Sequence, residues 1–84
     1  MDEKVIIEFI NLVKNEAHEL EIPVSITSNE LIKTLNEIYN LKMDLENLFS
    51  CYLISENPVA FLRGNKLLSE YGIHNGTRII YKGE

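Results

Sequence analysis

The sequence predicts an α+β fold in which a sheet packs on one helix, and three observations lead to that prediction. Residues 27–40 carry a helix-start motif followed by a single apolar stripe. Short segments before and after this helix alternate apolar and polar residues, as strands with one buried face do. Residues 67–81 combine a compact turn, a chain reversal and a closing strand. A chain of 84 residues allows one small core, so residues 1–84 are expected to form a single domain.

The first strand is expected at residues 5–12. Its uninterrupted apolar face is assigned to the core and consists of Val5, Ile7 and Phe9. Two isoleucines, Ile6 and Ile10, then lie on the open face. The polar turn at residues 13–16 predicts that the next strand returns antiparallel to the first.

The second strand, at residues 17–22, has the features of a sheet edge. Leu20 and Ile22 are expected to face the core, while Glu19 and Glu21 face outward. Pro23 lacks the N–H group that a sheet ladder needs, so it belongs at a strand end or on an edge. Outward glutamates on such a strand discourage association between sheets.

The helix start is marked by a capping box in Thr27-Ser28-Asn29-Glu30, with Thr27 as the N-cap and Glu30 three residues further on. Ile26 can pack on Leu31 as a hydrophobic staple. Asn40 is the expected terminator. The predicted core-facing stripe consists of Leu31, Ile32, Leu35, Ile38 and Tyr39.

The segment after the helix gives a weaker pattern. Residues 41–49 are expected to form a loop with a short helical turn. Residues 50–55 are interpreted as a strand with Cys51 and Leu53 inward and with Tyr52 and Ile54 outward. A turn at Glu56-Asn57-Pro58 and a short strand at 59–62 follow.

The closing stretch is the most informative part of the chain. Gly72 can adopt a positive φ and so end the compact turn. Ile73 is expected to point inward, and Asn75-Gly76 to reverse the chain. Residues 78–82 are β-branched and aromatic at their centre, which is typical of a strand. We expect this last strand to insert between strands formed earlier.

Composition argues against several classes of function. A net charge of −5 without a basic stripe disfavours binding to nucleic acid or to anionic lipid. A single cysteine, Cys51, cannot form an internal disulfide, which fits a reducing cytoplasm, and we expect it to be a small buried hydrophobe. His18 and His74 have no partners at metal-ligand spacing and are expected at the surface. No apolar run approaches the roughly 20 residues of a membrane span. We therefore expect no enzyme activity, no catalytic residues, no metal and no cofactor.

The motif Leu68-Ser69-Glu70-Tyr71-Gly72-Ile73, followed by Asn75-Gly76-Thr77 and an apolar strand, resembles the last third of ubiquitin-like proteins. The form Gly72-Ile73-x-Asn75-Gly76 more closely resembles the YukD-like family, small ubiquitin-like proteins of Gram-positive type VII secretion systems. The resemblance implies a β-grasp: a mixed four- or five-stranded sheet wrapped on one helix. In that fold the first and last strands are parallel neighbours at the centre, and the third strand flanks the last.

The same resemblance implies a binding surface and a function. It places Ile6, Ile80, Ile54 and Tyr52 next to one another on the helix-free face, with Ile10 beside them, and Arg78 and Lys82 at the rim, where they could steer an acidic partner. The implied role is a non-catalytic accessory subunit of a bacterial type VII secretion system. Its partner would be a membrane component or an ATPase of the apparatus, which would hold a cytoplasmic protein at the membrane. A homodimer through the same face is left open.

The alternative function is a ubiquitin-like modifier or sulfur carrier that is activated at its C-terminus. Such proteins use a flexible tail that ends in a double glycine. This chain ends Tyr81-Lys82-Gly83-Glu84, with one glycine and a charged last residue. The sequence therefore predicts that the chain is not conjugated. The initial Met1 favours a complete product, and a domain cut from a longer protein is left open.

Overall fold

A computed structural model of the protein describes residues 3–83, including every side chain in that range except that of Phe49. Glu84, the last residue of the predicted tail, lies outside the described residues. The elements follow one another as β1 (Lys4–Asn11), β2 (Glu16–Pro23), α1 (Ser28–Tyr39), η1 (Leu45–Ser50), β3 (Leu53–Glu56), β4 (Ala60–Leu62), η2 (Leu68–Tyr71) and β5 (Arg78–Tyr81), where η marks a 3₁₀ helix. No helix among residues 3–83 is long and apolar enough to cross a membrane.

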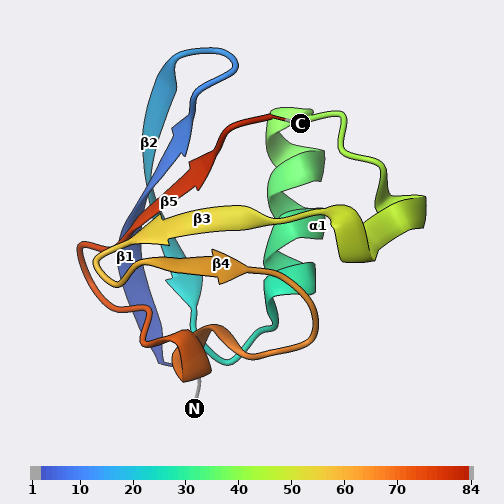
Figure 1. Ribbon diagram of the computed structural model, residues 1–84. Coiled ribbons are helices and arrows are strands. Elements are labelled where there is room, and N and C mark those ends of the chain that lie inside the picture. Colours follow the sequence, from blue (N-terminus) through green and yellow to red (C-terminus); the bar gives the residue numbers. More distant parts are fainter. Residues whose placement is uncertain (1–2, 84) are drawn as a thin grey trace.

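The strands form one mixed sheet in the order β2-β1-β5-β3-β4. β5 pairs parallel with β1 and antiparallel with β3, so the last strand is inserted between strands formed earlier, as predicted. In the part of the chain that the structure describes, β2 pairs only with β1 and lies at the edge of the sheet, which confirms the assignment from its glutamates and proline. In Figure 1 the red β5 lies between the blue β1 and the yellow β3, and α1 packs against one side of the sheet.

The core lies between α1 and the helix-facing side of the sheet. The predicted inward residues of β1 are buried there, and so is Ile73 after the compact turn. Cys51 and Leu53 are also buried, as predicted. The largest fully buried apolar side chains are Ile7, Phe9, Leu31, Ile32, Leu35, Leu53, Leu62, Leu68 and Ile79. Within residues 3–83, no helix packs on the other side of the sheet.

The start of α1 is the predicted capping box. The Glu30 amide donates to Thr27 Oγ1 over 3.1 Å, and the Thr27 amide donates to Glu30 Oε1 over 3.0 Å. At the other end Asn40 adopts the left-handed conformation with φ 51°, and its amide donates to the Asn36 carbonyl. Both helix ends therefore follow from local sequence signals.

Replacing Thr27 with alanine is expected to lower the free energy of unfolding by about 1 kcal/mol, because the Glu30 amide loses its acceptor. Urea denaturation followed by circular dichroism measures this change. Thr34→Ala is the matched control, since Thr34 is exposed within the same helix and alanine has the higher helix propensity. An equal loss in both variants would contradict the capping role of Thr27.

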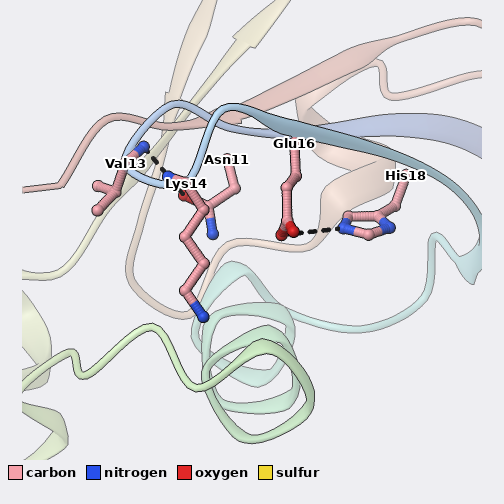
Figure 2. A network of polar contacts seen from close by, with 5 residues as sticks. All are labelled: Asn11, Val13, Lys14, Glu16 and His18. Carbon is pink, nitrogen blue, oxygen red and sulfur yellow. Dashed lines mark hydrogen bonds and ion pairs between the residues drawn. The ribbon is translucent and has the colours of Figure 1, made fainter.

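The turn between β1 and β2 is organised by a buried asparagine. Asn11 is 2% exposed, and its side-chain oxygen accepts hydrogen bonds from the amides of Val13 (3.0 Å) and Lys14 (3.2 Å). Figure 2 shows this side chain at the centre of the turn. One buried side chain thus satisfies two backbone donors that the turn leaves without a ladder partner.

His18 is not the plain surface residue that the sequence suggested. Strand alternation places it on the same side of β2 as Leu20 and Ile22, so it faces the helix. Its ring stacks on Tyr39 with centroids 4.6 Å apart, and its Nε2 lies 3.6 Å from Glu16 Oε1 (Figure 2). His74 is exposed in a turn, as expected.

The third strand begins later than predicted. Residues 45–50 form η1, whose first turn is capped by Asp44 through a hydrogen bond from the Glu46 amide. Consequently Cys51 and Tyr52 precede β3, which starts at Leu53. The alternation of buried and exposed side chains nevertheless continues back from the strand through Tyr52 and Cys51.

The assignment of Ile38 to the core stripe is wrong, because 64% of this side chain is exposed. Leu31, Ile32 and Leu35 of the same stripe are buried, and Tyr39 packs against the core. Ile38 borders a groove beside β2. No strand lies beyond β2 in the described sheet, so nothing covers this end of the stripe.

Candidate functional site

The open face of the sheet carries a continuous line of large apolar side chains. Register places Ile10 opposite Ile80, Ile80 opposite Ile54, and Ile54 opposite Phe61. We name these four residues the open-face row. Because directly opposed side chains lie about 4.5–5.5 Å apart at Cβ, the row forms one contact surface across β1, β5, β3 and β4.

The member of the row on the edge strand is the most exposed. Ile10, Ile80 and Ile54 are half-buried by their neighbours, whereas Phe61 on the edge strand β4 is 64% exposed. Tyr52 extends the surface, since its ring meets that of Phe61 edge-on with centroids 5.7 Å apart. Of the predicted anchors, the structure therefore brings together Ile10, Ile80, Ile54 and Tyr52.

Ile6 does not lie beside Ile80, and this part of the predicted patch is wrong. β5 begins opposite Glu8, and Ile80 aligns with Ile10 rather than with Ile6. The backbone of Ile6 is instead hydrogen-bonded to the loop that precedes β5. The Ile6 amide donates to Asn75 Oδ1 over 2.7 Å, and the Ile6 carbonyl accepts from the Gly76 amide. It borders a shallow depression that Glu8, Glu19 and Arg78 also line.

Arg78 is not a rim residue. It lies opposite Glu8 on β1 and Glu56 on β3, within the face and between Ile6 and the open-face row. Its Nε is 3.1 Å from Glu8 Oε1, and its Nη1 is 3.9 Å from Glu56 Oε1. The register also sets Glu19 opposite Glu8.

These residues form a second line across the sheet with three carboxylates and one guanidinium. We name Glu19, Glu8, Arg78 and Glu56 the charged row. Because its net charge is negative, this row favours a basic partner over the acidic partner expected from Arg78 and Lys82. Lys82 is exposed and follows Ile80 by two residues. By strand alternation it lies on the open face, on the side of the open-face row opposite the charged row.

Phe61 is the residue that sequence reasoning missed. The sequence predicts a short strand at residues 59–62 but does not show which of its side chains face outward. The hairpin around Asn57-Pro58 pairs Leu53 with Leu62, so the neighbouring pair is Ile54 and Phe61. Alternation along β4 places Phe61 outward because Leu62 is buried, and the hairpin register, which alternation alone does not give, sets it opposite Ile54.

The open face combines an apolar row with a row of three carboxylates and one guanidinium. Among residues 3–83 no cluster of three His, Cys, Asp or Glu side chains could hold a metal ion. Cys51 is buried and its Sγ lies 3.4 Å from the Asp44 carbonyl oxygen. An apolar row flanked by charges is suited to burial against another protein surface.

Comparison with known proteins identifies the architecture. The sequence matches no protein-family model, and no curated protein matches it significantly. Solved structures do match. The ubiquitin-like domain of tubulin-binding cofactor B aligns with a TM-score of 0.73 at 20% identity, over 95% of this chain and 89% of that one.

Two further structures agree. The C-terminal ubiquitin-like domain of mouse tubulin-specific chaperone e aligns with a TM-score of 0.70 at 16% identity, over 99% of this chain and 91% of that one. The ubiquitin-like domain of Plasmodium falciparum Dsk2 gives 0.62 at 16% identity, over 93% and 97%. At such identities the likeness concerns the fold. Residues 3–83 have the ubiquitin-like β-grasp fold.

Proposed function

We propose that this chain is a non-catalytic protein-interaction module that binds its partner through the open-face row. The observation that carries the proposal is the alignment of Ile10, Ile80, Ile54 and Phe61 across four strands, on a face that no helix of the described residues covers. Burying these side chains against a partner supplies affinity, because each removes apolar surface from water. The charged row and Lys82 set the orientation of the partner.

We further propose that the module is an accessory subunit of a bacterial type VII secretion system. The support is the resemblance of Gly72-Ile73-x-Asn75-Gly76 to the YukD-like family. These residues occupy the loop that binds β1 through Ile6, with Gly72 at φ 78° and Gly76 at φ 90°. The partner is then a membrane component or an ATPase of the apparatus, and the module is a cytoplasmic protein held at the membrane through it.

Phe61→Asp is expected to reduce partner capture at least about tenfold, because a carboxylate replaces the most exposed member of the open-face row. Wild-type and variant baits are incubated with cytosol and membrane extract of the source cells, and retained proteins are quantified by mass spectrometry. Phe61 is preferable to a double Ile54 and Ile80 substitution, since two aspartates directly opposite each other would also destabilise the sheet.

Val59→Asp is the matched control. Val59 is 84% exposed in the same hairpin but lies outside the open-face row, so its replacement is expected to leave capture unchanged. Thermal melting shows whether both variants remain folded. Retention of the same proteins by wild-type and Phe61→Asp baits would contradict the proposed surface. Recovery of an adenylating enzyme, together with an adenylate on the bait, would support the carrier function instead.

A further inference from the structure

A groove of about 310 Å³ runs between the edge strand β2 and helix α1, on the side of the sheet opposite the open-face row. Its lining is mainly apolar and includes Leu20, Ile22, Ile26, Leu35 and Ile38. The high exposure of Ile38 shows that the groove is open to solvent. Glu30 is the charged residue on the helix side of this lining, whereas the side chain of Glu21, opposite Ile6, points to the open face.

The backbone of β2 is available along the same edge. The amides of Glu8 and Leu12 donate towards β5, to the carbonyls of Thr77 and Tyr81. The even-numbered residues of β1 therefore bond with β5, and its odd-numbered residues bond with the even-numbered residues of β2. The odd-numbered residues of β2 consequently direct their N–H and C=O groups away from the sheet, at Ala17, Glu19 and Glu21.

A strand added at this edge would have a defined side-chain pattern. Alternate side chains would lie over the apolar groove, and the others would lie on the open face beside Glu19 and Glu21. Opposite charges in directly opposed cross-strand positions are favourable. The edge therefore favours aliphatic residues at one set of positions and lysine or arginine at the other.

The same charges disfavour a second copy of the chain as the occupant. In the registers that overlap most of β2, antiparallel pairing of two copies through their outward groups would set Glu19 opposite Glu19 or Glu21. Glu8 on β1 already lies opposite Glu19 and adds a further carboxylate. Like charges in opposed positions destabilise strand pairing, so the edge selects a basic segment of another protein.

We propose that the β2 edge and its groove form a second binding site, which takes up an extended basic peptide as an additional strand. The peptide alternates lysine or arginine with aliphatic residues. Its backbone bonds with Ala17, Glu19 and Glu21, and its aliphatic side chains cover Ile38 and Leu20. This site lies at the opposite end of the sheet order from Phe61, so both surfaces can be occupied at once.

The test uses two synthetic heptapeptides, one alternating lysine with valine and one alternating glutamate with valine. Fluorescence anisotropy with labelled peptides is expected to show saturable binding of the lysine peptide, at least about tenfold tighter than that of the glutamate peptide. Hydrogen exchange measured by NMR is expected to slow at the amides of Ala17, Glu19 and Glu21, because the bound strand protects them.

Two variants separate the groove from the edge charges. Ile38→Asp is expected to weaken binding of the lysine peptide about tenfold, since a charge replaces the exposed apolar contact. The double variant Glu19→Lys with Glu21→Lys is expected to reverse the preference in favour of the glutamate peptide. Glu37→Lys with Glu46→Lys makes the same change in net charge at exposed positions away from β2 and is expected to keep the original preference.

Three results would overturn the site. The first is the absence of saturable binding of the lysine peptide up to about 1 mM. The second is equal binding of both peptides by the wild type. The third is slowed exchange at amides outside β2 without any slowing at those of β2. Phe61→Asp is expected to bind the lysine peptide as the wild type does, which distinguishes this site from the open-face row.

Discussion

Replacing Phe9 with alanine is expected to lower the free energy of unfolding by about 3–5 kcal/mol. Phe9 is fully buried on the central strand β1, and its ring centroid lies 5.2 Å from that of Tyr39 on α1. The truncation removes apolar contacts and opens a cavity between the sheet and the helix. Because a small domain is stabilised by about 5–15 kcal/mol in total, this variant loses a large part of its stability. Urea denaturation measures it as a lower midpoint at unchanged slope.

Phe61→Ala is the matched control for this prediction. It makes the same chemical change in the same sheet, but the Phe61 side chain is 64% exposed on the open face. Its loss is expected to cost less than about 1 kcal/mol, as is usual at exposed positions. Comparable destabilisation by both variants would mean that the two faces of the sheet have been assigned incorrectly.

Asn11→Ala is expected to destabilise the fold by about 1–3 kcal/mol, the second largest effect. The substitution removes the acceptor for the amides of Val13 and Lys14 and leaves a small cavity beneath the turn. Hydrogen exchange at these two amides should accelerate more than exchange in the centre of the sheet, because the turn loosens first. Thermal denaturation of the variant gives the size of the effect.

Asn11→Leu distinguishes the hydrogen bonds from the packing. Leucine restores most of the volume in the buried position but accepts no hydrogen bond. We expect it to be destabilising as well, with fast exchange at both turn amides. A leucine variant as stable as the wild type would show that Asn11 contributes volume only.

The features that could be predicted from sequence are those set within one element. The capping box at Thr27, the terminator at Asn40 and the inward face of β1 each depend on residues a few positions apart. The position of the last strand also follows from a contiguous motif, in which Gly72 ends the turn and Ile73 is buried. Local signals of this kind act over a turn or a strand, so they can be recognised without knowledge of the rest of the chain.

The composition of the candidate site could be predicted only in part. Alternation predicts that Ile10, Tyr52 and Ile54 face outward, and the family resemblance adds Ile80, but neither chooses correctly between Ile6 and Ile10 as the neighbour of Ile80. That choice depends on the register between β1 and β5, which are almost the whole chain apart. The structure sets it through the loop before β5, where Asn75 and Gly76 bind the backbone of Ile6.

The sequence by itself determined the α+β class, both ends of the helix, the buried face of the first strand and the edge position of the second. Only the tertiary structure decided that Arg78 lies between two glutamates, that Phe61 completes the open-face row, and that Ile38 remains exposed beside an open groove. The physical reason is the range of the interactions. Capping and alternation act between near neighbours, whereas register and edge exposure follow from packing the whole sheet on one helix of limited width.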